Sequence, residues 1–463
     1  MKQITNINFQ QLTNNLIYPI YQNQTVNPEL SKLLDCDLNQ IIDKETKITT
    51  INTLNKLNFP TITFIGLGNP KQITTKKIKE LAYKIKLNQP AAIYLENIAT
   101  DSLDIKTITK TLIESYLIAA YQEQKIGHQP HEIIDLDIIY SKHDLTNEIN
   151  EAINQAKGIN YARYLSDLPS NLMTPEDLVN EAKKLAETYN LECTILDKKD
   201  LIAMQAGGIL AVNQGSNIPA YLICLKYSTG KQPDMAIIGK AIAFDSGGYT
   251  IKNNSYGMKY DMCGGADVLG IMQILAANHV DANVYGIIPT TENLISGAAY
   301  KPQDVITMLS KKTVEIVSTD AEGRLILADA ITYAKQLGVE KIIDLATLTG
   351  ACVHALGDVY TGAFSNDEKF YQAFSNAAKR SNEKIWRLPI DDEYFDKLKS
   401  NSADFKNSVG KPGAGASVAA TFLAQFVGDT KWIHLDIAGT ADNNGTGATG
   451  AMISSIVDLI KHS

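Results

Sequence analysis

The stretch MAIIGKAIAF, Met235–Phe244, carries one charged residue, Lys240, in an otherwise uncharged and mostly apolar run. A near-continuous apolar run of this kind is typical of a strand buried on both faces of a sheet. A second such run is KIIDLATLTG, Lys341–Gly350, and a helix with apolar periodicity is predicted at residues 325–336. Strands alternating with helices predict an α/β fold, in which ligands bind beyond the carboxyl ends of the strands.

Glycine-rich sequences follow several of these apolar runs. They include DSGG (245–248), CGGAD (263–267) and LTG (348–350), and all three are predicted as turns. Turns at the ends of parallel strands lie along one edge of a sheet, so this edge is the expected place for a site.

The first 150 residues have α/β character of their own. A strand at 61–68, a helix at 74–86 and a strand at 91–97 form a predicted parallel unit. A long polar helix at 145–165 follows and is predicted to connect two domains. We therefore expect a smaller N-terminal α/β domain at 1–158, serving packing and assembly, and a larger C-terminal catalytic α/β domain at 159–463. The larger domain is expected to have a central mixed sheet flanked by helices.

The composition excludes several classes of protein. The chain has 463 residues and a formal charge of −8, which argues against nucleic acid as the main partner. Its five cysteines form no CxxC pair, which is typical of reduced intracellular thiols. No window of about 18 apolar residues is present, so no membrane span is expected. These features predict a soluble cytoplasmic protein.

The histidines form no recognisable metal or nucleophile motif. His434, in WIHLDIAG, lies in a predicted strand and is interpreted as a structural histidine. His354 follows a glycine turn and is a candidate for lining a pocket. Histidine is therefore not the expected centre of the chemistry.

Charged residues inside apolar surroundings are the more informative candidates. Lys240 would be costly to bury unpaired, and as a neutral amine its pKa would have to fall from about 10.4 to below 7, at about 4–5 kcal/mol. A metal ion would compensate this cost, and so would an Asp or Glu partner or a stem that reaches the surface. Asp245 and Asp261 precede glycines and suit a divalent cation, although Asx-turns or helix caps explain them equally well.

A straight strand would keep Lys240 and Asp245 apart. They would lie about 16 Å from each other, at about 3.3 Å per residue, and would point to opposite faces. Both can reach one site only if the chain bends or the strand stops near Lys240. Gly239 is the expected position of a bulge or of a close backbone approach.

The stretch STDAEGRLILADAITYA, Ser318–Ala334, allows two interpretations. Thr319 and Glu322 fit a capping box at the start of a helix. Alternatively, Asp320, Glu322 and Arg324 would lie on one side of an extended segment and point into one site. Gly323 favours the second interpretation, because glycine in a first helical turn costs about 1 kcal/mol. The helix would then begin only after Gly323.

Together these segments supply one amine and four carboxylates. Four negative charges balance two divalent ions, and oxygen ligands with one nitrogen suit Zn²⁺ or Mn²⁺ better than Mg²⁺. Spacing alone does not bring such distant segments together. The candidate ligands are Lys240, Asp245, Asp261, Asp320 and Glu322.

Four blocks of the chain resemble the signature blocks of the leucyl (cytosol) aminopeptidases, the M17 metallopeptidase family. The resemblance covers about residues 160–463. It implies release of N-terminal residues, preferably leucine-like ones, from peptides by attack of a metal-bridging water, in a homohexamer. The blocks are GKAIAFDSGGYTIK (239–252), MKYDMCGGADVLG (258–270), STDAEGRLILADAITYA (318–334) and ATLTGACVHALG (346–357).

The resemblance also implies roles for individual residues. Two divalent ions, Zn²⁺ or Mn²⁺, would be held by the same five candidate ligands, and Lys252 and Arg324 would be the catalytic pair. A bicarbonate would lie beside Arg324. Its other neighbours would be Ala321, Gly323 and Leu348, and the substrate pocket would include Lys252, Met258, Thr347 and Gly350.

The chain departs from this family at a few positions. Ser318 stands where asparagine is usual, Gly265 and Asp267 stand where alanines are usual, and His354 replaces a small apolar residue. Asp267 is expected to add a negative charge near the site. Two other classes of function stay open from the residues alone: a two-metal phosphoesterase, and a DNA-binding or scaffold protein with a vestigial site.

Overall fold

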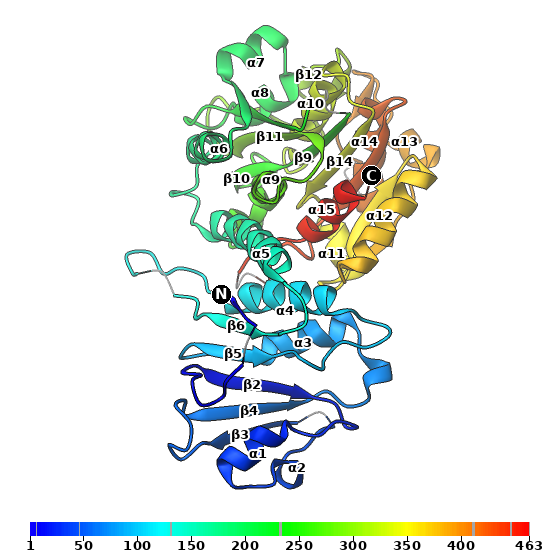
Figure 1. The fold of residues 1–463 in the computed structure, drawn as a ribbon. Helices are drawn as coiled ribbons and strands as arrows, with labels where there is room; N and C mark the ends of the chain where they lie inside the picture. Colours follow the sequence, from blue (N-terminus) through cyan, green and yellow to red (C-terminus); the bar gives the residue numbers. More distant parts are fainter. Residues whose placement is uncertain are drawn as a thin grey trace. The chain divides into compact units, whose positions relative to one another are not determined.

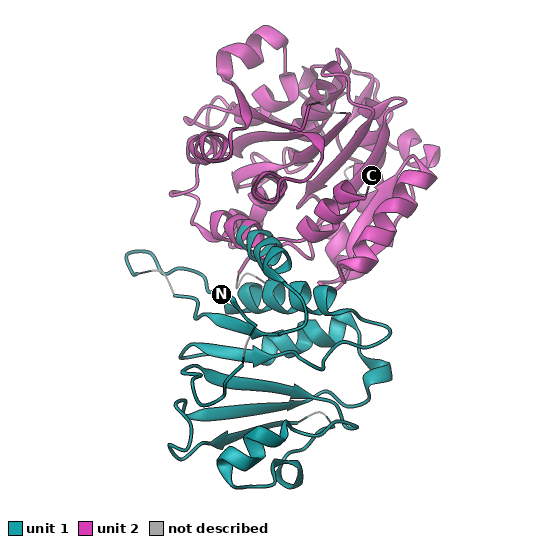
Figure 2. Ribbon diagram, viewed as in Figure 1, with its two compact units in different colours: residues 1–157 teal, residues 158–463 magenta. Residues whose placement is uncertain are grey.

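The computed structural model describes residues 1–5, 7–45, 47–129, 132–230, 234–409, 413–444 and 447–462. The chain forms two compact units, Met1–Lys157 and Gly158–Ser463 (Figure 2). The division lies one residue from the boundary predicted from the sequence. The helix predicted there is present as α5 (Thr146–Asp167), and it contributes residues to both units.

Unit 1 is built on a six-stranded sheet that is parallel except for its last strand. The predicted strand–helix–strand unit is confirmed as β4 (Thr61–Gly66), α3 (Thr75–Lys84) and β5 (Ala91–Tyr94). The order is β1 (Gln3–Ile4), β6 (Leu136–Ile139), β5 (Ala91–Tyr94), β2 (Asn15–Ile20), β4 (Thr61–Gly66) and β3 (Ile48–Asn52).

Helices cover both faces of this sheet (Figure 1). On one face, α3 (Thr75–Lys84) and α4 (Ile105–Ala120) bury residues at helical spacing such as Ile78, Leu81 and Ala82. On the other face, α1 (Pro28–Leu34) and α2 (Leu38–Ile41) pack against alternate residues of the same strands. A strand has period two, so one strand supplies both cores.

Unit 2 contains the mixed sheet that was predicted, and this sheet has nine strands. Its central strands β18 (Lys431–Asp436), β14 (Lys341–Ala346), β9 (Met235–Gly239) and β11 (Asn283–Asn293) run parallel. The strand β8 (Tyr221–Ser228) is antiparallel to both its neighbours, whereas β15 (Thr361–Ser365) is antiparallel to β18 and parallel to its other neighbour. The order is β16 (Ile385–Arg387), β15 (Thr361–Ser365), β18 (Lys431–Asp436), β14 (Lys341–Ala346), β9 (Met235–Gly239), β11 (Asn283–Asn293), β8 (Tyr221–Ser228) and β7 (Glu192–Leu196), with β10 (Ala241–Asp245) also beside β11.

Helices flank both faces of the large sheet (Figure 1). One group packs with the even-numbered residues of β9 in a large apolar core, and a second group lies on the opposite face. The first group includes α8 (Gly207–Asn213), α10 (Gly323–Gln336), α11 (Gly350–Leu356), α13 (Asp392–Asp396) and α14 (Gly415–Val427). The second includes α6 (Pro175–Tyr189), α9 (Cys263–Ala277), α12 (Glu368–Arg380) and α15 (Ile453–Lys461), while α7 (Lys198–Met204) follows β7.

The apolar run that predicted a single strand is divided into β9 and β10 at Lys240. The interruption resolves the geometric conflict between Lys240 and Asp245. Gly239 lies against Gly264, since a Cβ at Gly239 would be 2.1 Å from the Gly264 carbonyl oxygen. The predicted close approach at Gly239 is thus present, and the irregular register lies further along, between Ile242 and Asp245.

One predicted turn is wrong. CGGAD (263–267) forms the start of α9 and not a turn. A Cβ at Gly264 would be 2.3 Å from the Leu345 carbonyl oxygen, and one at Gly265 would be 2.7 Å from the Ala241 Cβ. These glycines therefore allow α9 to pack directly against the strands. They are present because of this close packing and not because the chain turns there.

A small sheet of β12 (Val305–Thr307), β13 (Thr313–Glu315) and β17 (Phe405–Lys406) lies outside the large one. It pairs chain segments about 90 residues apart, with Val314 opposite Phe405. Among the described residues, no helix is long and apolar enough to cross a membrane.

We predict that Gly239→Ala destabilises unit 2 by about 1–3 kcal/mol, because the added methyl group would overlap the Gly264 backbone. The free energy of unfolding from denaturant titration checks this. Gly297→Ala is the matched control, since a Cβ there meets nothing within 4 Å. Equal stability of the two variants would contradict the close approach.

Candidate metal centre

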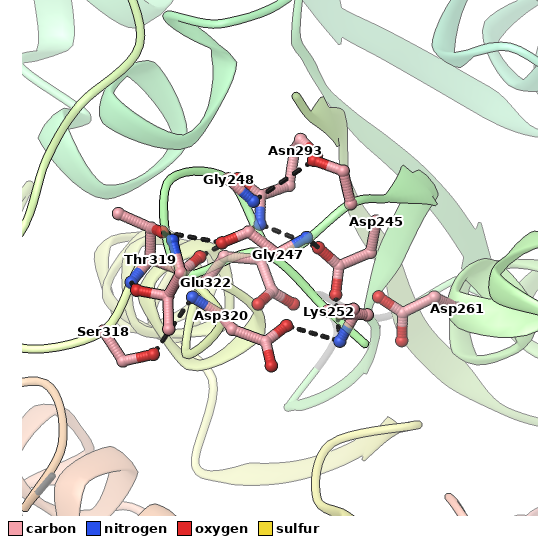
Figure 3. A network of polar contacts seen from close by, with 12 residues as sticks. Asp245, Gly247, Gly248, Lys252, Asp261, Asn293, Ser318, Thr319, Asp320 and Glu322 are labelled. Carbon is pink, nitrogen blue, oxygen red and sulfur yellow. Dashed lines mark hydrogen bonds and ion pairs between the residues drawn. The ribbon is translucent and has the colours of Figure 1, made fainter. Parts of the chain in front are cut away.

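The candidate ligands come from four loops at one edge of the large sheet. Lys240 lies in the break between β9 and β10, and Asp245 ends β10. Asp261 lies in a 3₁₀ turn, Met258–Met262, before α9. Asp320 and Glu322 precede α10. Figure 3 shows the carboxylates of Asp245, Asp320 and Glu322 converging with Lys252 between them, and Asp261 beside them.

The start of α10 decides between the two interpretations of the stretch at 318–334. The helix begins at Gly323, two residues earlier than predicted, and Glu322 occupies the N-cap position without a side-chain cap bond. The capping box is therefore wrong. The Thr319 hydroxyl instead donates to the Gly247 carbonyl and accepts from the Thr250 N–H. A Cβ at Gly323 would be 2.6 Å from Lys240 Nζ, so glycine here makes room for the lysine.

Lys240 is buried, and its ammonium has three oxygen partners. Nζ lies 2.8 Å from Asp261 Oδ1, 3.0 Å from Glu322 Oε1 and 2.8 Å from the Thr347 carbonyl oxygen. Burial lowers the pKa of Lys240, but the carboxylates of Asp261 and Glu322 outweigh it, and the net pKa lies above the usual value. The carboxylate partners expected as an alternative to metal are thus present.

Lys252 links the other two carboxylates. Its Nζ lies 2.8 Å from Asp245 Oδ2 and also pairs with Asp320 (Figure 3). Burial opposes the charge, but the nearby carboxylates raise the pKa of Lys252 above its usual value. Each lysine therefore bridges carboxylates from two different loops.

The site holds more negative than positive charge. Four carboxylates face the two ammonium groups, so the fully ionised site would carry an excess of two negative charges before Arg324 is considered. Burial, with the neighbouring acids, raises the pKa of Asp261 to about 8 and that of Asp320 to about 6. Burial also raises the pKa of Glu322, but Lys240 and Lys252 outweigh it and lower the net value. A divalent cation would relieve the repulsion among these acids.

The donor set fits a divalent ion. One oxygen from each of Asp245, Asp320 and Glu322 lies within 4.8 Å of the others. In addition, Asp261 Oδ2 is buried without a hydrogen-bond partner among the described residues. A buried carboxylate oxygen without a partner is costly unless a cation or donor completes it.

Comparison with known proteins gives the same family along nearly the whole chain. A family model described as the cytosol aminopeptidase family, catalytic domain, matches residues 160–457. The chain is 40% identical over 461 residues to a probable cytosol aminopeptidase of Bacillus subtilis, covering 93% of this chain and 92% of that one. A probable cytosol aminopeptidase of Exiguobacterium sibiricum is 37% identical, with 96% of each chain covered.

The chain belongs to the cytosol aminopeptidase family. It is a metal-dependent aminopeptidase, and the resemblance stated from its sequence blocks is confirmed. A solved structure of the bottromycin maturation enzyme BotP, in complex with Mn, has a TM-score of 0.86 and 25% identity. That similarity covers 97% of this chain and 99% of the other.

The remaining residues that the resemblance implied for a cytosol aminopeptidase lie on the same side of the sheet. Met258 begins the 3₁₀ turn that carries Asp261. Thr347, Leu348 and Gly350 follow β14, and the Thr347 hydroxyl donates to Asp261 Oδ1 at 2.8 Å. Ala321, Gly323 and Arg324 flank Glu322.

Arg324 is a buried cation at this site. Its Nη1 donates to the Asn407 carbonyl at 2.7 Å, and its Nε has no hydrogen-bond partner among the described residues. Burial lowers the pKa of Arg324 to about 10, which still leaves the guanidinium charged at neutral pH. An anion bound here would satisfy the free donor.

Polar residues that the sequence analysis missed connect the loops of the site. Asn293 Nδ2 donates to Asp245 Oδ1 at 2.7 Å and to the Thr319 carbonyl at 3.0 Å. The Tyr300 hydroxyl donates to the same carbonyl. Asp436 accepts from the N–H groups of Leu348 and Thr349. A polar residue at the end of a buried strand, such as Asn293 at the end of β11, was the available signal.

The departures from the family have limited effects on the site. The Ser318 hydroxyl accepts from the Asp320 N–H at 3.2 Å, which keeps a polar contact at this position. Asp267 is buried in α9, and this burial raises the pKa of its carboxyl group. His354 is exposed, and its Nδ1 bonds the Gly350 carbonyl within α11.

His434 is a buried structural residue, as interpreted from the sequence. Its Nδ1 lies 2.6 Å from Asp344 Oδ1, and Asp344 Oδ2 accepts from Trp432 Nε1. Burial lowers the pKa of His434, but Asp344 and Asp436 outweigh it despite the opposing charge of Arg324, so the net pKa is raised.

We predict a pH dependence of stability from this histidine. Its folded pKa exceeds the unfolded value of about 6.5, so its stabilisation is complete below that pH and is lost as the pH rises through the raised pKa. The difference in Tm between the unsubstituted protein and His434→Gln should therefore shrink with rising pH. A difference that grows from pH 6 to pH 9 would contradict the charged Asp344–His434 pair.

Proposed function

We propose that this aminopeptidase uses two divalent ions held by Lys240, Asp245, Asp261, Asp320 and Glu322 to release leucine-like residues from the N-termini of peptides. The single observation that carries the proposal is the convergence of four carboxylates with an excess of negative charge. The buried Asp261 Oδ2, which has no hydrogen-bond partner in the described part of the chain, supports it.

Both lysines have to change partners if metal ions take these oxygens. Lys240 binds Asp261 and Glu322 as an ammonium, so it becomes a nitrogen ligand only by losing a proton. Lys252 occupies oxygens of Asp245 and Asp320, so competition by cations would free its ammonium for the substrate. Metal binding is therefore expected to release protons and to strengthen with pH.

The ions, when bound, would acidify a water and polarise the scissile carbonyl. Lys252 would donate to the carbonyl oxygen of the substrate as negative charge develops on it. Met258, Thr347 and Gly350 would form the substrate pocket around the N-terminal residue. Arg324, with its free Nε, would hold a bicarbonate between Ala321, Gly323 and Leu348.

The metal and the assembly are also proposed. One nitrogen with carboxylate oxygens suits Zn²⁺ or Mn²⁺, and the similarity to BotP in complex with Mn supports Mn²⁺. We infer a homohexamer, in which unit 1 serves packing and assembly. A cytoplasmic location fits the five free thiols and the cytosol aminopeptidase relatives.

The phosphoesterase and the DNA-binding or scaffold alternatives lose support from the family membership. A peptidase site also explains a lysine among the ligands better than a phosphoesterase site does. Assays of peptidase activity, phosphodiester cleavage and DNA binding separate the three functions.

We predict that leucine p-nitroanilide is cleaved with Mn²⁺ or Zn²⁺ present, and that EDTA abolishes the cleavage. The matched substrate N-acetyl-leucine p-nitroanilide should not be cleaved, because exopeptidase action requires a free α-amine. Absorbance of released nitroaniline measures both. Cleavage of a bis-nitrophenyl phosphate instead would favour the phosphoesterase. No cleavage of any substrate, together with salt-sensitive DNA binding, would favour the DNA-binding or scaffold protein.

We predict that Lys252→Ala lowers kcat by about 10²–10³, as the loss of one oxyanion donor does. Mn²⁺ binding should persist, because the substitution removes a competing cation from Asp245 and Asp320. Steady-state kinetics and the bound-metal content check this. Lys301→Ala, at an exposed lysine paired with Asp304, is the control. Full kcat with metal bound would show that the role given to Lys252 is wrong.

A further inference from the structure

We propose that Asn407 is the positioning residue for the stretch that carries Asp320, Glu322 and Arg324. The inference rests on the proposed function, because it concerns the residues assigned to the metal ions and the anion. Asn407 touches none of the assigned metal ligands through its side chain. Its side chain hydrogen-bonds the backbone of Val317, Ser318 and Ala321, the residues next to these ligands in the sequence.

The small sheet places Asn407 at the site. Asn407 follows β17, and its N–H donates to the Glu315 carbonyl at 3.0 Å, beside the Glu315–Lys406 pair that ends the β13–β17 ladder. The residue is fully buried. The small sheet therefore connects a distant segment of the chain to the residues directly after β13.

The Asn407 side chain hydrogen-bonds both N–H and C=O groups of the backbone between residues 317 and 321. Its Oδ1 accepts from the N–H of Val317 at 2.8 Å and of Ser318 at 3.3 Å. Its Nδ2 donates to the carbonyl oxygens of Ser318 at 2.7 Å and of Ala321 at 3.4 Å. The Asn407 carbonyl accepts from Arg324 Nη1 at 2.7 Å.

An amide is the chemical group that this arrangement requires. Residues 317–321 have no regular secondary structure, so their buried N–H and C=O groups need partners from elsewhere. The asparagine amide offers an acceptor and two donors in one plane, whereas an ionised aspartate can only accept. The Asn407 side chain thus supplies the hydrogen bonds that a neighbouring strand would otherwise give to this stretch.

The bonds of Asn407 also explain why the chain tolerates Ser318. All contacts from Asn407 to position 318 go to the backbone N–H and C=O. The path of the chain toward Asp320 therefore does not depend on the side chain at position 318. On the other side of the stretch, Thr319 is fixed by Thr250 and Gly247.

The test compares Asn407→Ala and Asn407→Asp with Asn213→Ala. Asn213 is an equally buried asparagine whose Nδ2 donates to the Ile218 carbonyl and to Thr291, so it controls for the general cost of losing a buried amide. Three quantities are measured for each full-length protein. They are the apparent Kd for Mn²⁺ from the EPR signal of free Mn²⁺, kcat and KM on leucine p-nitroanilide, and hydrogen exchange of peptides spanning residues 317–324 after EDTA treatment.

We expect Asn407→Ala to raise the apparent Kd for Mn²⁺ by about 10–100-fold, as loss of a partner behind metal ligands does. It should lower kcat more than it raises KM, and hydrogen exchange over 317–324 should accelerate. Asn407→Asp should also weaken Mn²⁺ binding, because a carboxylate cannot donate to the Ser318 and Ala321 carbonyls. Asn213→Ala should lower Tm but leave the Mn²⁺ affinity and the exchange of this segment unchanged.

Two results would overturn the proposal. One is Mn²⁺ affinity and kcat of Asn407→Ala equal to those of Asn213→Ala, and the other is unchanged hydrogen exchange over 317–324. If the unsubstituted protein binds no Mn²⁺ and cleaves no leucine p-nitroanilide with Mn²⁺ or Zn²⁺, the proposed function fails instead. The exchange of the EDTA-treated protein then decides alone whether Asn407 orders this stretch, since that measurement needs no metal.

Discussion

The cost of placing four carboxylates in one largely buried site is the constraint on which the rest of this structure depends. Asp245, Asp261, Asp320 and Glu322 repel one another in a medium that screens charge poorly. Two lysines offset part of that repulsion, and a divalent cation would relieve the rest. The acids come from three segments of the chain, the end of β10, the 3₁₀ turn before α9 and the stretch before α10, so these segments must be held together against the repulsion.

The support comes from close backbone packing and from polar residues that join the loops. Gly239 and Gly264 let β9 and α9 touch, and Gly323 leaves room for the Lys240 side chain. Asn293 and Thr319 connect the loop after β10 to the stretch before α10. None of these residues carries the chemistry, yet each fixes a segment that does. Uncharged residues thus hold the charged side chains of this site in place.

The lysines give the site a second property. In the structure, Lys240 and Lys252 neutralise carboxylates that the proposed function assigns to metal ions. Under the proposed function, protons and metal ions would compete for the same groups, and metal binding would depend on pH. A lysine that pairs with acids before metal binds also keeps the folded protein stable, because a buried carboxylate without a partner is strongly destabilising.

The sequence by itself determined the α/β class, the mixed sheet, the family and the set of acids and lysines, because apolar runs and long motif blocks are local signals. It could not determine that the run at Met235–Phe244 breaks at Lys240, or that CGGAD begins a helix. Both depend on glycines that pack against segments distant in the chain. Only the tertiary structure showed the Lys240 and Lys252 ion pairs and the bonds of Asn407 to residues 317–321, which join segments about 90 residues apart. Hydrogen bonds of this kind leave no periodicity in a sequence, since their geometry exists only once the sheet has formed.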